Sequence, residues 1–344
     1  MTEKSLDCVI SILKGEEIES VPDWYEILGF LECNRISGLF YNRAKQQGVM
    51  LPKKIENILK GIFERQKMKV IFLRRNVKKI SEKLIEAGAE HVLLKGSVLT
   101  NLDGLIYKDG ERTSNDIDIL VKPSGISAVS NVLCELGFIQ GYIENRKIIP
   151  YSRLEILKRR MNRGEVAPFV KLTGNNEFPY LEVDINFSLG NTPSEYQELL
   201  SGIIDSSKIL QNKVKMRVAD AERFFLHLIM HQYKESCIAF MVERNKDLDL
   251  YKLADIYYFI KLGVLDLNRI KELVLKYGIE QETGTVLSQV GNIFSDLEIM
   301  SMASEYKFKK PQVIDYESKK VYEWTASERE RLCCFDAKKY LKEI

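Results

Sequence analysis

Two aspartates separated by one residue, Asp116 and Asp118, stand at the start of an apolar run that ends at Val121. If this run is a β-strand, alternate side chains share a face, so the two carboxylates lie roughly 6.5–7 Å apart along the backbone. Charges this close repel each other unless a cation neutralises them. Mg²⁺ prefers carboxylate oxygens and bridges to phosphate oxygens. The pattern therefore predicts a magnesium site, with Mn²⁺ as the alternative metal, and two ions would suit displacement at phosphorus.

A turn that could bind phosphate precedes the aspartates. Lys95, Gly96 and Ser97 follow a short apolar run, 91–94, and precede an expected helix at 98–106. At a strand-to-helix turn, glycine lets the backbone approach a phosphate, which the N–H groups and the Ser97 hydroxyl would bind. Lys95 would add a positive charge for a triphosphate.

A third carboxylate is expected from a later strand, 180–187. Glu182 and Asp184 are two residues apart there and share a face. Either could complete the metal site or take a proton from an acceptor hydroxyl. The spacing alone does not choose between them.

The segments around these residues resemble the DNA polymerase β-like nucleotidyltransferase superfamily. More narrowly, they are similar to a largely uncharacterised bacterial nucleotidyltransferase family, through the KG-containing strand end, Arg112 ahead of the Asp-x-Asp strand, and the strand that carries Asp184. The likeness continues into the helical segments 222–231 and 253–256, and so spans about residues 20–260. Two departures are a wide separation between turn and aspartates, and Asn186 where relatives often have histidine. The second leaves the acceptor side open.

The resemblance implies a reaction and assigns roles. A nucleoside monophosphate would pass from an NTP to an acceptor hydroxyl, with release of pyrophosphate. Asp116 and Asp118 would bind two Mg²⁺, Asp184 would be the third acidic ligand with Glu182 as its rival, and Gly96 with Ser97 would contact phosphate. Arg112 is expected, with Lys95, Gly96 and Ser97, among the nucleotide-binding residues as a support of the site, and a simple salt bridge is its equal alternative. The acceptor could be a small molecule, an RNA or a protein.

The expected elements form an α+β protein in three parts. A helical region at 1–88 precedes a nucleotidyltransferase core with a small mixed sheet at 89–190, and a second helical region covers 191–344. Apolar periodicity and end signals predict the following further elements. They are helices opening at Pro22-Asp23, at Pro52 (to Leu84) and at Pro123 (to Gly137), strands at 169–172 and 180–187, a helix capped by Asp220, and helices at 249–261, 267–276 and 279–303. The last forty residues fit no clear pattern.

Composition narrows the class of protein. Of the 344 residues, 45% are hydrophobic and the formal net charge is +2, so sizeable cores form and no global field demands a nucleic acid. Six scattered cysteines without a CxxC pair indicate reduced thiols. No apolar stretch reaches the 18 or so residues of a membrane helix, and the N-terminus lacks the basic start of a signal peptide. We expect a cytoplasmic protein with no membrane partner.

Three features have structural as well as functional interpretations. The segment 51–80 has ten Lys or Arg against two Glu, and we favour the wet side of an amphipathic helix over an RNA surface. A second basic run, 142–163, could hold phosphate or acceptor through Arg153, Lys158 or Arg159. His227 and His231 are spaced like a metal pair but lack a third ligand, which favours packed histidines.

A different class of function also fits the sequence. The fold could serve as a non-catalytic module that binds nucleotide, RNA or a protein, as in a toxin–antitoxin or defence system. The intact Asp116, Asp118 and Ser97 argue against this interpretation, because a retired site has no reason to keep a repulsive acidic cluster.

Overall fold

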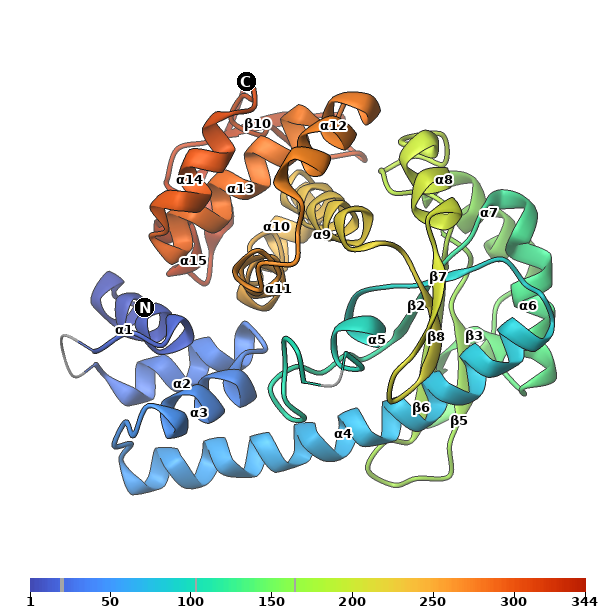
Figure 1. Cartoon of the computed structure of the whole chain (residues 1–344), viewed down its shortest axis with the longest axis horizontal. Coiled ribbons are helices and arrows are strands. Elements are labelled where there is room, and N and C mark those ends of the chain that lie inside the picture. The colour runs from blue at the N-terminus through green and yellow to red at the C-terminus, as the bar shows by residue number, and fades with distance from the viewer. Residues whose placement is uncertain (19–21, 103, 164) are drawn as a thin grey trace. The chain divides into compact units, whose positions relative to one another are not determined.

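The computed structural model describes residues 1–18, 22–102, 104–163 and 165–344. The chain groups into two compact units, whose helices and strands are labelled in Figure 1. Unit 1 comprises residues 1–66, 110–112 and 228–344, and unit 2 comprises residues 67–109 and 113–227. Helix α4 (Lys53–Glu86) starts in unit 1 and ends in unit 2, and α9 (Ala221–Ser236) runs the other way. The three-part division at residues 88 and 190 stays a prediction.

Unit 2 is built on a six-stranded sheet with the order β1-β2-β6-β5-β3-β4. Its strands are β1 (Val92–Leu93), β2 (Ile117–Leu120), β3 (Ile139–Glu144), β4 (Lys147–Pro150), β5 (Phe169–Leu172) and β6 (Tyr180–Asn186). β2 and β6 pair in parallel, and the other neighbours pair antiparallel. The sheet is therefore mixed, and the predicted α+β class is confirmed.

One face of the sheet belongs to the core. In β6 the apolar Leu181, Val183 and Ile185 are buried, and the residues between them are half-buried and polar. This alternation follows from the two-residue period of a strand. The apolar side of the strand therefore packs in the core, and its polar side carries the candidate site residues Glu182 and Asp184.

The remaining elements of unit 2 frame the sheet. They are α5 (Lys95–Leu99), η1 (Pro123–Gly125), α6 (Ile126–Glu135), α7 (Arg153–Arg163), α8 (Gln197–Asp205) and the hairpin β7 (Lys208–Gln211) with β8 (Lys215–Val218). The helix predicted at 98–106 is instead the shorter α5, which starts at Lys95 and ends at Leu99. Gly104, inside the predicted range, has a φ of 79°, a value that lies outside helical geometry. The hairpins β3–β4 and β7–β8 were not predicted.

Unit 1 is mainly helical. It holds α1 (Glu3–Lys14), α2 (Trp24–Cys33), α3 (Ser37–Gln46), α10 (Ala239–Glu243), α11 (Leu250–Lys261), α12 (Leu267–Tyr277), α13 (Glu280–Phe294), α14 (Leu297–Ser304) and α15 (Glu328–Leu332). Asp23 accepts from the backbone N–H groups of Tyr25 and Glu26, as a helix start at Pro22-Asp23 requires. The single helix predicted at 279–303 is two helices, because Ser295 has a φ of 50° and Asp296 caps α14.

The C-terminal segment that resisted prediction forms a small sheet. Strands β9 (Val313–Ile314), β10 (Val321–Trp324) and β11 (Leu341–Glu343) pair antiparallel in the order β11-β10-β9, and the short helix η2 (Ala337–Tyr340) precedes β11. Val313 and Trp324 pack with residues of α10 and η2 in a local core. These strands are too short to show a period in the sequence.

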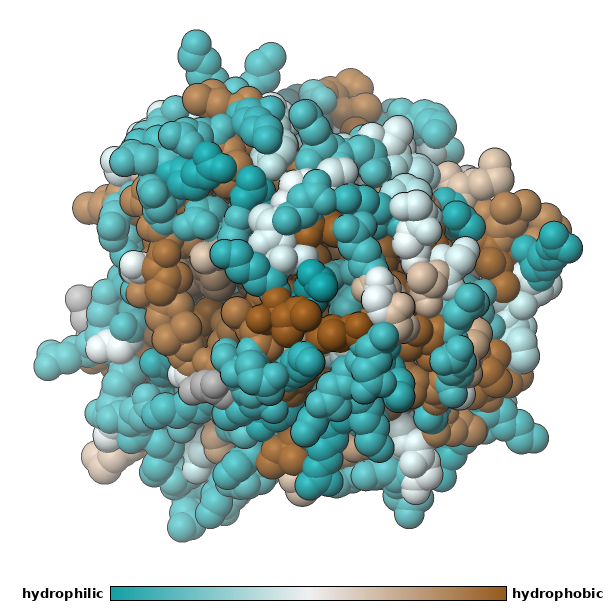
Figure 2. Space-filling view, turned by 45° about the vertical axis from the view of Figure 1, so that its right-hand side comes forward, coloured by the Kyte–Doolittle hydropathy of each residue, from teal (hydrophilic) through white to brown (hydrophobic). Residues whose placement is uncertain are grey.

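The surface mixes hydrophilic and hydrophobic side chains (Figure 2). In the basic helix α4, the apolar Ile55, Val70 and Val77 are buried and Lys78 and Lys79 are exposed. This is the arrangement of an amphipathic helix with a solvent-exposed basic side.

None of the helices that the structure describes combines the length and apolarity of a membrane span.

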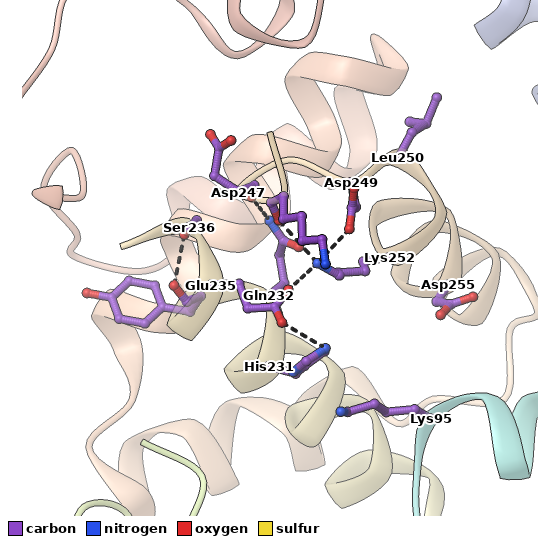
Figure 3. Close-up of polar contacts among 12 residues, drawn as sticks. Lys95, His231, Gln232, Glu235, Ser236, Asp247, Asp249, Leu250, Lys252 and Asp255 are labelled. Carbon is purple, nitrogen blue, oxygen red and sulfur yellow. Dashed lines mark hydrogen bonds and ion pairs between the residues drawn. The ribbon is translucent and has the colours of Figure 1, made fainter. Parts of the chain in front are cut away.

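A buried lysine joins α9 to α11 within unit 1 (Figure 3). Lys252 is 5% exposed, and its ammonium group contacts Glu235 of α9 and lies 3.0 Å from Asp249. It also donates to the carbonyl oxygen of Lys246 at 3.1 Å. Each buried charge of this cluster therefore has a partner of opposite sign, as low-dielectric surroundings demand.

Replacing Lys252 with methionine should destabilise the protein strongly. The side chain keeps its length, but Glu235 and Asp249 lose their cation, which costs about 3–5 kcal/mol for a broken buried pair. Urea unfolding followed by circular dichroism measures the loss. Lys271→Met is the matched control, because Lys271 makes an exposed pair with Glu305 at 2.6 Å and such pairs contribute about 0–1 kcal/mol. Equal losses in both variants would contradict the assignment.

Candidate active site

The pairing of β2 with β6 places acidic side chains next to one another. In this parallel pair Asp118 is the register partner of Asp184, and Ile117 is the partner of Val183. Partners in a parallel register point to the same face. Asp116 directly precedes β2 and is two residues from Asp118, so its side chain joins that face. The strand geometry therefore gathers three aspartates from two segments.

The three carboxylates form one compact cluster. Ligand oxygens of Asp116, Asp118 and Asp184 all lie within 4.8 Å of one another. Asp118 is 3% exposed, and the other two are half-buried. Ser114 Oγ donates to Asp116 Oδ1 at 2.7 Å, and Lys95 Nζ donates to Asp118 Oδ1 at 2.8 Å. Among the described residues, this is the one group of three or more metal-ligating side chains close enough to share an ion.

The cluster is electrostatically costly without a cation. Burial raises the pKa of Asp118 to about 6, although Lys95 opposes the rise. Burial, and then the charges of Asp118 and Asp116, raise the pKa of Asp184 to about 8. The donors are all carboxylate oxygens, the ligands that Mg²⁺ and Mn²⁺ take. The residues present thus fit a divalent metal.

Glu182 lies on the same face but outside this cluster. It precedes Asp184 by two residues on β6, and burial followed by the charges of Asp116 and Asp118 raises its pKa. Of the two candidates for the third carboxylate, the structure brings Asp184 together with the Asp-x-Asp pair. Glu182 stands one step further along the strand, beside the position of Asp116.

Comparison with known proteins identifies the family. The profile of a family described as uncharacterised nucleotidyltransferase matches residues 20–295. The chain belongs to this nucleotidyltransferase family. A search of curated proteins finds no match. The crystal structure of an antigenic nucleotidyltransferase-like protein from Paracoccidioides brasiliensis is similar at 17% identity, covering 69% of this chain and 94% of that chain, with a TM-score of 0.42.

The glycine of the predicted phosphate turn has a steric role. A Cβ at Gly96 would lie 2.9 Å from Cβ and 3.1 Å from Oγ of Ser114. Only glycine lets the turn approach Ser114, whose hydroxyl holds Asp116. Lys95 has a φ of 47°, so the backbone turns sharply just before Gly96. Ser114 was not predicted to have a role, although a serine two residues before an aspartate is a recognisable local hydrogen-bonding pattern.

A pocket opens beside this turn. It is lined by Gly96, Ser97, Ser114 and Asp116 and by apolar residues of α4. Ser97 is 5% exposed and so lies at the pocket's wall rather than on open surface. The turn and the first aspartate of the acidic cluster therefore line the same pocket.

Arg112 sits within unit 1, in a buried ion pair. Its Nε donates to Asp255 Oδ1 at 3.0 Å and its Nη2 donates to Asp255 Oδ2 at 3.0 Å. The guanidinium group also lies 4.4 Å from the ring centroid of Tyr251. Of the two roles left open for Arg112, the salt bridge is visible, and a contact with nucleotide stays a prediction. Asp255 is 143 residues away in the chain, so no local signal could have named it.

The histidines spaced four residues apart on α9 form no metal group with other described residues. His231 Nε2 lies 3.8 Å from Glu235 Oε1, so its neighbour is the acid that also contacts Lys252 (Figure 3). His227 is buried. Both positions agree with packed histidines.

The stability of the metal-free protein should fall as pH rises. Asp184 keeps its proton in the folded state up to a pKa of about 8, whereas its ordinary pKa is 3.8. Between these values the folded state binds more protons than the unfolded state, so stability is lost from about pH 4 through pH 8. Urea unfolding in chelator at a series of pH values measures this. Asp184→Asn should flatten the profile, and Asp205→Asn, at an exposed site, should not. An unchanged profile in Asp184→Asn would refute the assignment.

Gly96→Ala should destabilise unit 2 by about 1–3 kcal/mol, because the added methyl group overlaps Ser114. Adding Ser114→Gly removes the overlapping atoms and should restore most of the lost melting temperature. Gly61→Ala is the control, since a Cβ there meets nothing within 4 Å and alanine favours a helix by up to about 1 kcal/mol. If the double variant were no more stable than Gly96→Ala, the contact would not be the cause.

Proposed function

We propose that the protein is a magnesium-dependent nucleotidyltransferase that moves an NMP from an NTP to an acceptor hydroxyl. The observation that carries the proposal is the cluster of Asp116, Asp118 and Asp184, whose oxygens lie within 4.8 Å of one another in a chain of this family. Two raised carboxyl pKa values support it, because perturbed acids concentrate at functional sites.

The three aspartates would hold the metal, with two Mg²⁺ preferred and Mn²⁺ as the alternative. Bound there, the ions would neutralise the carboxylates and the phosphate oxygens during in-line displacement. Asp184 is the preferred third ligand because it is the register partner of Asp118. Ser114 would orient Asp116 through its hydrogen bond of 2.7 Å. The carboxylates are thus set in place by the sheet before any ligand arrives.

The turn at 95–97 would bind the triphosphate. Gly96 and Ser97 line the pocket beside Asp116, where backbone N–H groups and the Ser97 hydroxyl can meet phosphate oxygens. Lys95 already lies against Asp118, and its ammonium group would contribute positive charge where the phosphates meet the carboxylates. Arg112 would support nucleotide binding without touching the phosphates, because its guanidinium group forms a salt bridge with Asp255.

The reaction joins the acceptor oxygen to the α-phosphorus. The bond from that phosphorus to the bridging oxygen breaks, and pyrophosphate leaves with the electron pair. The proton of the acceptor hydroxyl passes to a carboxylate, for which Glu182 lies on the same face, with a pKa that burial raises. Glu182 would therefore act as base, while Asp184 completes the metal site.

The acceptor remains a small molecule, an RNA or a protein in this proposal, and the NTP base is equally open.

The six cysteines are free, which supports the reducing, cytoplasmic compartment expected from their spacing.

Asp118→Asn should abolish nucleotide transfer while the protein stays folded. The amide keeps the side-chain shape but removes a metal-ligating charge, so the transfer rate should fall about 10²-fold or more. The assay incubates the protein with each labelled NTP, Mg²⁺ and a cell extract, and follows label into metabolite, RNA and protein fractions. Magnesium-dependent NTP binding, measured by calorimetry, should be lost in the same variant.

Asp205→Asn serves as the control, because Asp205 is exposed and pairs with Lys122 at 2.7 Å. It should leave both NTP binding and transfer unchanged. If the wild type bound no NTP with Mg²⁺ or Mn²⁺, the chain would instead be a non-catalytic binding module on the same fold.

A further inference from the structure

Helix α7 carries its apolar side chains on the side that faces water. Leu154, Leu157 and Met161 are 60%, 53% and 67% exposed, and their spacing of three and four residues places them on one stripe. Away from this stripe, Ile156 and Arg159 are half-buried, and the guanidinium group of Arg159 lies 4.6 Å from the ring centroid of Tyr151. A surface helix normally turns its apolar stripe inward. The stripe of α7 is thus available to a partner.

The stripe is bordered by positive charge. At 3.6 residues per turn, Arg153 and Arg160 lie along one edge and Lys158 along the other. All three are exposed, and within the part of the chain that the structure describes none of them has an ion-pair partner. The helix's acidic residue, Glu155, accepts from Ser152 at the helix start instead. The stripe with its two edges is therefore apolar at the centre and cationic at the rim.

The segments on both sides of α7 join the sheet that carries the candidate site. Ahead of the helix, the backbone N–H of Tyr151 donates to the carbonyl oxygen of Gln140 in β3 at 3.0 Å. The chain that follows α7 returns to this sheet at β6, where Glu165 bridges to Asn186. A partner seated on α7 would therefore lie beside the candidate active site, within unit 2.

We propose that α7 is a docking surface for an acidic amphipathic helix of a partner protein. Anchors at i, i+3 and i+7 are the spacing by which one helix packs on another. Carboxylates on the partner would complement the cations at both edges. A second copy of this chain would instead set cation against cation. RNA bases stack on aromatic rings, and the stripe holds only aliphatic side chains.

The test uses a synthetic fluorescent peptide and the full-length protein. The peptide is about 15 residues long, has leucines at helical spacing flanked by glutamates, and is compared with a scrambled peptide of the same composition. Fluorescence anisotropy should show at least tenfold tighter binding of the amphipathic peptide. Leu157→Glu should weaken that binding at least tenfold. Lys158→Glu with Arg160→Glu should weaken it and remove most of its salt dependence.

Leu275→Glu is the matched control, because Leu275 is also an exposed helical leucine, 67% exposed on α12 of unit 1 against 53% for Leu157. It should leave peptide binding unchanged, and circular dichroism should show that every variant is folded. The measurement needs neither Mg²⁺ nor NTP, so its outcome is independent of the proposed catalysis.

Four results would overturn the proposal. The scrambled peptide could bind as well as the amphipathic one, or neither could bind. Vesicles of phosphatidylglycerol and phosphatidylcholine, or a single-stranded RNA, could bind in a manner that Leu157→Glu abolishes. Sedimentation could show a wild-type dimer that Leu157→Glu dissociates, in which case a second copy covers the stripe.

Discussion

The parallel pairing of β2 with β6 is the constraint on which the candidate active site depends. Its register sets Asp118 beside Asp184 on one face, and Ile117 beside Val183 on the buried face. A shift of one residue would turn the apolar side chains outward, so the core holds the register firmly. Hydrophobic packing on one side of the sheet therefore forces together carboxylates that would otherwise separate.

Buried charge is handled differently in the two units. In unit 1, Lys252 lies between Glu235 and Asp249, and Arg112 is engaged by Asp255, so opposite charges neutralise each other. In unit 2 the aspartates share one lysine, and burial raises the carboxyl pKa values of Asp118 and Asp184. The first arrangement stabilises a fold, and the second leaves a deficit of positive charge that a ligand can supply.

The sequence predicted the elements that carry a strong period or a clear end signal. The long α4, the helix start at Asp23 and the strand with Asp184 were expected and are present. Short strands such as β9 have too few residues to show alternation. The helix expected at 98–106 ends at Leu99, and Gly104, with a φ of 79°, lies within its expected continuation in a conformation that a helix does not contain. The acidic residues could be named from their spacing. Which of them meet depended on strand register, and contacts such as Arg112 with Asp255 depended on tertiary packing.

Ser114 links the turn at Gly96 to Asp116, the first aspartate of the cluster. Ser114 lies so close to Gly96 that a Cβ there would be 2.9 Å from its own Cβ, and its hydroxyl donates to Asp116 at 2.7 Å. If one ligand binds the turn and another binds the carboxylates, this link couples the two binding equilibria, and the coupling is reciprocal. An anion that fixes the conformation of the turn would raise the affinity of the carboxylates for a cation. The cation would raise the affinity of the turn for the anion by the same factor.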